Sequence, residues 1–498
     1  RIRLPAILWT GSTSPHAPMH RLTTSLSLLS LCLTAPVLAA GQSGTFDPFD
    51  TQAAVAPQPC TRPQISGALG LADVVDLALC NNPQTREAWA NARVQAGLVG
   101  VAQAPYLPSL TGTVGNNRLR VKTEGQDANN KTLNSATLSL SWLLYDFGVR
   151  EANLESARQL LSAAVATQDS TSQQVFLAAL QAYYQVHALQ AALDAAELSE
   201  KAARESLAAA EARYRAGSAT PADRLQAQTA LSQATLTRIR VGGELKNARG
   251  ALANAIGLDA NRPVQLATMR TLMPPTDFEQ NVDTLIDEAR RRRPDLTSAE
   301  AQLKAAQASV DANRAAHLPS FSLAATPNWV DSSGLTTNTS NIGVSVTIPI
   351  FTGFSQTYKV RTAEAQAELK AAQRDRLQLQ VALDVWKSYQ SLITSTQSMR
   401  TTADLLASAE QSEKVALGRY RAGVGSILDL LTAQSALASA RQQRVLSAYD
   451  WNVSRATLAQ SVGVLDAAIL PVLADERPLP PLPVLPQSSV LPAADGKP

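Results

Sequence analysis

The chain's basic and acidic side chains gather in a motif that occurs twice. Arg213-Tyr214-Arg215-Ala216-Gly217 is followed by Asp223, and Arg419-Tyr420-Arg421-Ala422-Gly423 is followed by Asp429, each acid six residues after its glycine. Glycine after a helix favours the left-handed C-cap conformation, and an acid in the next helix's first turn interacts favourably with the helix dipole. The motif therefore predicts a charged helix–turn–helix tip in two copies, 206 residues apart (419 − 213).

The residue patterns of common enzymes are missing from the sequence. It contains no phosphate-binding loop, HExxH or GxSxG motif, and beyond residue 40 its histidines are His187 and His317. We therefore expect no catalytic site, metal or cofactor. The formal net charge of +3 gives no nucleic-acid footprint, and we interpret the basic run 290–293 as a solvated helix end.

The duplication extends beyond the tips, which predicts two copies of one long unit. The offset is 211 for two proline pairs and 206 for a glycine pair, namely Pro83 and Pro294, Pro108 and Pro319, and Gly257 and Gly463. About five residues are therefore missing from the second copy, and we expect the gap in its strand-connecting loop. We place repeat 1 at 71–260, a linker at 261–280 and repeat 2 at 281–466.

The two ends of the chain differ from the repeats. After Met19, a short basic stretch precedes an apolar run from Leu26 to Leu38 and small residues before Ala40, which is the order of an export signal. We expect upstream sequence and signal over 1–40, an extension over 41–70, and a proline-rich disordered tail over 467–498. No later run is apolar enough for a transmembrane helix.

Two cysteines remain after the predicted signal, Cys60 and Cys80. An even pair in an exported chain predicts one disulfide, here between the extension and the first helix. The alternative is two free buried thiols.

Each repeat predicts a β-hairpin, at about 109–147 and about 320–350. In the first hairpin the second strand alternates between an apolar face that includes Leu138, Leu140 and Trp142 and a face of serine and threonine. Pro327 weakens the first strand of the second hairpin. Aromatic residues near the strand ends resemble the girdles of membrane strands.

Each hairpin precedes a long helix, about 148–215 and about 356–421, and then a return helix. The short and return helices, about 22 and about 38 residues, together nearly match the long helix of about 68 residues, or about 100 Å. They could therefore lie end to end along it. The first long helix has a coiled-coil seam from Val175 to Tyr214 that only Glu200 breaks, whereas the second has Ser388 and Ser395, which suggests a wetter environment.

Strands of this alternating kind after an export signal match those of a transmembrane β-barrel. An open sheet cannot span lipid, and four strands are fewer than the eight of the smallest barrels. Closure therefore requires several chains, and three chains would give twelve strands. The alternative is the edge of a soluble sandwich.

Over about 70–466 the chain resembles the TolC family of outer-membrane efflux proteins. The resemblance rests on Leu71–Pro83, Tyr106–Leu110, Trp142–Gly148 and the two tips. It implies a mainly helical homotrimer with a coiled-coil tunnel in the periplasm and a barrel in outer-membrane lipid. It also implies two further partners, a periplasmic adaptor and an inner-membrane ABC or proton-driven transporter.

The resemblance implies a gate at the second tip, where the Asp429 carboxylates of three copies would favour cations. Where the family has a second acidic residue at the gate, this chain has Thr432, and where the family has an arginine that supports the closed state, it has Gly425. The tyrosine and the aspartate that link neighbouring helix pairs in the family match Tyr420 and Asp223. The alternative role for both acids is stabilisation of a helix start. The resemblance also implies adaptor contacts at the tips, by Arg213, Arg215, Gly217, Arg421 and Gly423.

Three function classes follow in order of preference. The first is an export duct, for type I protein secretion rather than small-molecule efflux, because the sequence lacks a lipidation site and its N-terminal helix resembles the secretion branch. The second is a coiled-coil structural protein of the cell surface, which leaves the alternating strands unexplained. The third is an enzyme, which the missing motifs disfavour.

Overall fold

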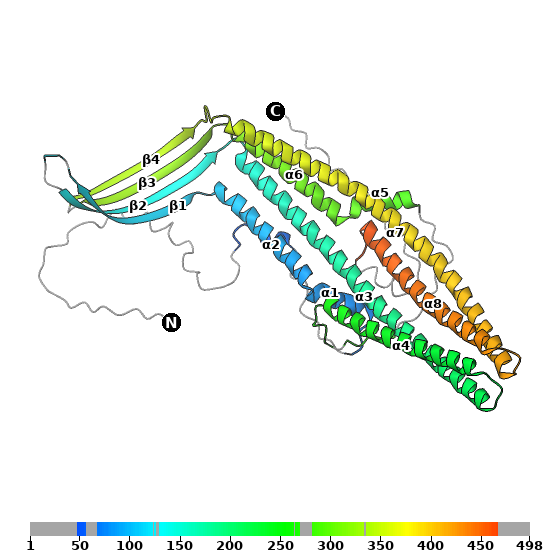
Figure 1. The fold of residues 1–498 in the computed structure, drawn as a ribbon. Coiled ribbons are helices and arrows are strands. Elements are labelled where there is room, and N and C mark those ends of the chain that lie inside the picture. The colour runs from blue at the N-terminus through cyan, green and yellow to red at the C-terminus, as the bar shows by residue number, and fades with distance from the viewer. Residues whose placement is uncertain are drawn as a thin grey trace, which may run out of the picture. The chain divides into compact units, whose positions relative to one another are not determined.

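The computed structural model describes residues 47–55, 67–122, 124–125, 129–262, 264–268, 281–332 and 335–466. The predicted signal, Cys60 and the proline-rich tail lie outside these residues. In chain order the elements are η1 (Thr51–Ala54), α1 (Leu71–Asn81), α2 (Pro83–Gln103), η2 (Ala104–Tyr106), β1 (Ser109–Val121), β2 (Asn129–Tyr145), α3 (Val149–Arg215), α4 (Pro221–Ala255), α5 (Val282–Arg292), α6 (Pro294–Ala315), β3 (Ser320–Ser332), β4 (Leu335–Thr347), α7 (Ser355–Arg421) and α8 (Ile427–Val462) (Figure 1).

The same order of elements occurs twice, as two short helices, two strands, a long helix and a return helix (Figure 1). The long helices α3 and α7 each have 67 residues, and the return helices α4 and α8 have 35 and 36. The connection between β1 and β2 covers 122–128, whereas that between β3 and β4 covers 333–334, so it is five residues shorter (7 − 2). The length difference therefore lies where the sequence offset places it.

The long helix α3 packs against α2, α4, α6 and α8, and α7 packs against α6 and α8. Figure 1 shows α2 beside the first part of α3 and α4 beside its last part, the predicted end-to-end arrangement. The main apolar core lies where α1, α3, α4 and α8 meet, and it includes Val74, Phe176, Leu180 and Leu252. Fully buried alanines such as Ala179 allow the helices to approach closely.

The break in the α3 seam at Glu200 is filled by polar partners from α4. The Glu200 carboxylate accepts a hydrogen bond of 2.9 Å from Thr235 and pairs with Arg238 at 2.6 Å. These two hydrogen bonds, first that of Thr235, lower the pKa of Glu200. The seam prediction is wrong at its end, because Tyr214 is 39% exposed.

The prediction of a wetter second coiled coil is wrong for its serines. Ser388 and Ser395 are buried, and each hydroxyl donates back to a carbonyl of its own helix. The Ser388 hydroxyl also lies 2.7 Å from that of Ser461 on α8. Paired hydroxyls satisfy one another without water, so small polar residues pack here much as alanine does.

The basic run 290–293 is only partly solvated. Arg290, Arg291 and Arg292 form the last turn of α5, but Arg293 lies between α5 and α6 with a side chain only 16% exposed. It pairs with Asp295 at 2.6 Å and with Asp384 of α7 at 3.2 Å. Arg293 therefore joins the short helices to the long helix.

The four strands form one antiparallel sheet in the order β1-β2-β3-β4, so the two hairpins pair through β2 and β3. Within this sheet the outer edges of β1 and β4 have no neighbouring strand. Pro327 is accommodated inside β3, although proline cannot donate a ladder hydrogen bond. The pairing of β2 with β3 lapses between Thr137↔Asn328 and Leu140↔Ala325, at the level of this proline, and resumes in the same register.

The two faces of the sheet differ in chemistry, because directly paired residues of an antiparallel sheet share a face. One face carries serine, threonine and asparagine, for example Thr137 bonded to Asn328 at 2.8 Å. The other is apolar and includes Leu110, Val114, Leu138, Leu140, Trp142, Leu323, Ile342, Val344 and Val346. Most of these apolar side chains are exposed in the single chain, which is the pattern of strands in contact with lipid.

Aromatic side chains cluster at the helical end of the sheet. The ring centroids of Tyr145 and Phe147 are 4.7 Å apart, and those of Phe351 and Phe354 are 5.5 Å apart. All four side chains are exposed in the single chain. They occupy the place of the predicted aromatic girdle.

Two findings concern the export and membrane predictions. Cys80 at the end of α1 is disulfide-bonded, and its predicted partner Cys60 lies outside the described residues. Among the described helices, none combines the length and apolar character needed to cross a bilayer.

Candidate gate at the helix tips

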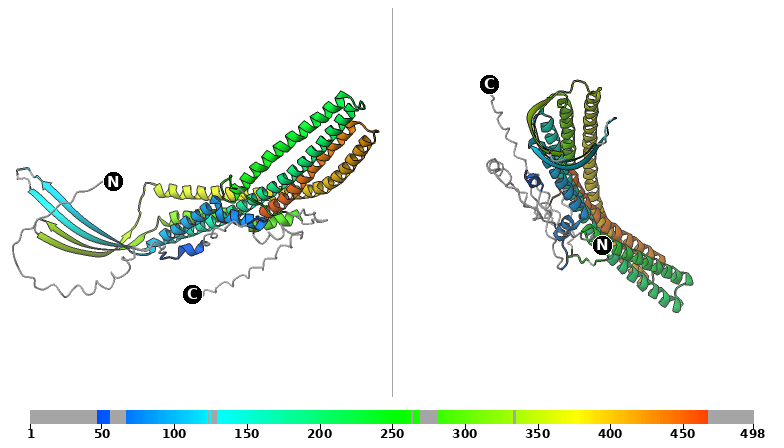
Figure 2. Two further views of the ribbon diagram at one scale, coloured as in Figure 1. Left: turned by 90° about the horizontal axis from the view of Figure 1, so that it is seen from below. Right: turned by 90° about the vertical axis from the view of Figure 1, so that its left-hand side faces the viewer.

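The two tips have the same backbone but different surroundings. The left image of Figure 2 shows the hairpins α3–α4 and α7–α8 side by side, with both tips at one end. Gly217 and Gly423 have positive φ angles of 72° and 79°, as the sequence motif predicts. The next residue of each turn donates back to the last helical turn, Ser218 to the Arg213 carbonyl at 2.9 Å and Val424 to the Arg419 carbonyl at 3.0 Å.

Both tip acids take part in capping boxes at the start of the return helix. The Asp223 carboxylate accepts a 2.9 Å bond from the backbone amide of Thr220, and the Asp429 carboxylate accepts a looser 3.4 Å bond from that of Ser426. Each capping hydroxyl accepts a hydrogen bond from the amide of its acid, the reciprocal pattern of this motif. The acids therefore stabilise their helices, and the Asp429 side chain is also exposed.

The side chain of Arg213, in the first tip, contacts Tyr420 of the second tip. The Arg213 guanidinium lies 4.3 Å from the centre of the Tyr420 ring, and its Nη2 donates to the Tyr420 carbonyl. Tyr420 is only 4% exposed and packs with Ile427 and Leu430. Its counterpart Tyr214 is exposed.

The predicted link between Tyr420 and Asp223 does not form in this single chain. The Tyr420 hydroxyl is buried and has no hydrogen-bond partner among the described residues. The Asp223 carboxylate is bonded to the backbone and hydroxyl of Thr220. The contact between the tips is made instead by Arg213, which the sequence analysis assigned only to the adaptor.

Gly425 is packed too closely to be replaced by an arginine without a shift. A Cβ atom there would lie 3.0 Å from the Cβ of Arg419 and 3.1 Å from the amide nitrogen of Tyr420. The Gly425 amide donates to the Arg419 carbonyl at 3.1 Å. The turn of the second tip is therefore held by its own backbone hydrogen bonds, and the guanidinium that contacts Tyr420 belongs to Arg213 of the first tip.

Gly425, Asp429 and Thr432 line one groove between α7 and α8, beside Arg419 and Leu428. Three predicted gate residues therefore lie on one face, whereas Tyr420 lies beneath it in the small core. The predicted adaptor residues Arg215, Gly217, Arg421 and Gly423 are exposed at the two turns.

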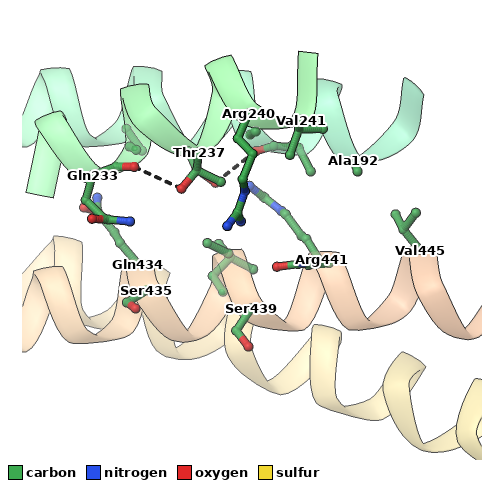
Figure 3. A pocket seen from close by; sticks show the side chains of 18 of the residues that line it. Ala192, Gln233, Thr237, Arg240, Val241, Gln434, Ser435, Ser439, Arg441 and Val445 are labelled. Carbon is green, nitrogen blue, oxygen red and sulfur yellow. Dashed lines mark hydrogen bonds between the residues drawn. The ribbon is translucent and has the colours of Figure 1, made fainter. Parts of the chain in front are cut away.

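A second groove of about 530 Å³ lies between α4 and α8. Its floor is formed by α3, with Ala188, Ala192, Ala195, Ala196 and Ala203. Figure 3 shows that Arg240 of α4 and Arg441 of α8 point into the space between the helices. Neither residue was predicted from the sequence, because each repeat contributes only one wall of the groove.

Among the described residues, no group of three or more His, Cys, Asp or Glu side chains could hold a metal ion. His187 packs against the ring of Tyr183 with 4.6 Å between ring centres, and burial lowers the pKa of this imidazole. His317 follows α6, before β3.

The comparisons with known proteins agree with this architecture. The family model described as outer membrane efflux protein matches residues 74–258 and 285–464, one stretch in each repeat and together most of the chain. The chain belongs to this family. It is accordingly an outer-membrane export channel with a helical tunnel in the periplasm.

Relatives and solved structures cover most of the chain. Protein CyaE of Bordetella pertussis is 32% identical over 425 residues, covering 84% of this chain and 89% of CyaE. The alkaline protease secretion protein AprF of Pseudomonas aeruginosa is 25% identical over 435 residues, covering 82% and 87%. The Campylobacter jejuni CmeC outer membrane channel has the same fold, with a TM-score of 0.71, 19% identity, and coverage of 79% of this chain and 85% of CmeC.

Proposed function

We propose that this outer-membrane channel is the exit duct of a type I protein secretion system and works as a homotrimer. The observation that carries the trimer is the open four-stranded sheet with one apolar face. In lipid the free edges of β1 and β4 must pair, and a two-chain barrel of eight strands would leave little lumen. Three chains close twelve strands around the face of serine, threonine and asparagine.

The sequence relatives support protein cargo. AprF is named for secretion of an alkaline protease. A second candidate is export of small molecules, because the pyoverdine export outer membrane protein OpmQ of Pseudomonas aeruginosa is 28% identical over 416 residues. An inner-membrane ABC transporter supplies the energy in the first case, and a proton-driven transporter could do so in the second.

The second tip is the proposed gate of this duct. In a trimer, three Asp429 carboxylates lie around one axis above Thr432 and favour cations at the mouth. Arg213 holds Tyr420 in place and thereby keeps each second tip against the first tip of the same chain. Asp223 acts on its own helix start, and Gly425 keeps the turn compact.

A periplasmic adaptor is the proposed partner at the tips. Arg215, Gly217, Arg421 and Gly423 are exposed there, whereas the guanidinium of Arg213 is engaged by Tyr420. The groove between α4 and α8 has an alanine floor and carries Arg240 and Arg441 together with Glu244 and Glu413, so it fits an amphipathic helix with side chains of both charges.

A secretion assay separates protein export from small-molecule export. The chain is produced in a bacterium without its own export channel, together with an adaptor, an ABC transporter and a protein substrate of a type I system. Substrate protein in the medium is the expected result. Restored drug resistance without secreted protein would favour the small-molecule candidate, and neither activity from a correctly assembled channel would contradict the proposal.

A further inference from the structure

Two arginines extend the apolar face of the sheet at the end remote from the helices. Along β1, Leu110 and Val114 belong to this face, and Arg118 and Arg120 follow on it at the same alternation. The register of β1 with β2 is continuous from Ser109↔Ser141 to Val121↔Asn129. Both arginine side chains therefore point to the same side as the apolar residues.

A polar row separates these arginines from the apolar band. The Asn116 amide donates to Asn134, and the Asn134 amide approaches the Asp331 carboxylate at 3.5 Å. Trp329, on the same face of β3, lies one step closer to the apolar band. Tryptophan is enriched where hydrocarbon gives way to headgroups, so the amide row beyond Trp329 lies on the headgroup side.

At the same level of the sheet, the opposite face changes from polar to apolar side chains. It carries serine and threonine along most of its length, for example Thr137, Ser139 and Ser141, but Leu119, Leu133 and Val330 near the hairpin ends. Apolar side chains thus move to the other face where the arginines begin. The change places Arg118 and Arg120 outside the hydrocarbon layer yet on its side of the sheet.

Both arginines are free to bind a ligand. Arg118 and Arg120 are exposed, and neither forms a hydrogen bond or ion pair with another described residue. The acid of this face and level, Asp331, lies two strands away and is approached by the amide of Asn134. A pair of unneutralised guanidinium groups beside an apolar band matches the phosphates of a lipid whose acyl chains contact that band.

We propose that Arg118 and Arg120 bind the phosphate groups of anionic lipids in the outer leaflet of the outer membrane. This inference rests on the proposed trimeric barrel, in which the apolar face contacts lipid. Each trimer then carries six such arginines, two at each β1 edge, where one chain meets the next.

The experiment measures lipid A retained by the purified trimer, using native mass spectrometry in a neutral detergent. Arg118→Gln combined with Arg120→Gln is expected to weaken lipid A binding about thirtyfold, because each of the two cations removed contributes about 1 kcal/mol near a charged surface. Wild-type binding should weaken with added salt, and removal of the lipid phosphates should weaken it as the double substitution does. Lys131→Gln is the matched control, since Lys131 pairs with Leu119 on the opposite face, and it should bind as wild type does.

The outcomes separate this inference from the proposed function. A trimer that binds lipid A equally in wild type and the double variant overturns the lipid site and leaves the duct intact. Equal loss of lipid A binding in the double variant and in Lys131→Gln also overturns it, because binding would then depend on the net charge of the protein and not on the face of the sheet that carries the cation. A wild-type protein that forms no trimer contradicts the proposed function itself.

Discussion

The guanidinium of Arg213 stacks 4.3 Å from the ring centre of Tyr420 and donates to the Tyr420 carbonyl. The two residues are 207 positions apart and belong to different repeats. The contact therefore joins one helical hairpin to the other at the tip. It also makes the tips unequal, since Tyr420 is buried and Tyr214 is exposed.

Removing this contact should loosen the second tip. A cation–π contact of this kind contributes about 0.5–2 kcal/mol, so Arg213→Gln is expected to raise the open-to-closed ratio of the channel by up to about thirtyfold. Open probability in planar bilayers measures the effect. Arg215→Gln is the control, because Arg215 is exposed and its Nε donates only to a carbonyl of its own helix. Equal open probability in both variants would show that the contact between Arg213 and Tyr420 does not hold the channel closed.

The charge of Asp429 should control ion preference without affecting helix capping. Asp429 is the third residue of α8 and accepts only a loose 3.4 Å hydrogen bond from the Ser426 amide. The side-chain oxygen of asparagine can accept the same bond, so Asp429→Asn removes the charge and keeps the helix start. We expect the cation-to-anion permeability ratio to fall about fivefold, for a change of about 1 kcal/mol in the potential at the mouth. Reversal potentials in a salt gradient report this ratio. Asp223→Asn should leave it unchanged, and a similar fall in both variants would contradict the assignment to one tip.

Two glycines with similar backbone angles should differ in their tolerance of alanine. Gly217 has a φ of 72° with open space around it, so Gly217→Ala is expected to cost about 1–2 kcal/mol. Gly257 has a φ of 76°, but a Cβ atom there would lie 2.6 Å from the backbone oxygen of Asn81. Gly257→Ala should therefore destabilise the protein more than Gly217→Ala does. Thermal unfolding of the two variants tests the order, and equal losses would show that the contact with α1 relaxes.

The buried Glu200 should make part of the stability depend on pH. Hydrogen bonds from Thr235 and Arg238 lower its pKa below the ordinary glutamate value. Its stabilising contribution is therefore present above that ordinary pKa, about 4.3, and is lost as the pH falls through the lower folded-state pKa. Glu200→Gln should flatten the dependence of the unfolding midpoint on pH in this acidic range. Glu197→Gln, at an exposed position one turn earlier, should retain the wild-type slope.

The long elements could be predicted from the sequence because their signals are local. The alternation around Leu138 and Trp142 identified a strand, and the seam in α3 identified a coiled coil, since each pattern reports the period of its own element. The tip glycines and acids were also predictable, because C-caps and capping boxes depend on a few neighbouring residues.

The contacts between the two repeats could not be predicted in this way. Arg213 and Arg419 occupy the same place in the motif, yet only the packing of the hairpins decides which tyrosine is covered. Ser388 was interpreted as a wet position because its partner hydroxyl, that of Ser461, lies in another helix. Arg240 and Arg441 share a groove that neither repeat forms alone.

Three copies of this chain are proposed to form one channel through the outer membrane. Single-channel recording of the purified wild-type protein in a planar bilayer tests this proposal most directly, with the mass of the same sample measured in detergent. The expected result is a trimer that inserts and gives discrete conductance steps with a preference for cations. A folded monomer that never inserts into the bilayer would contradict the proposal.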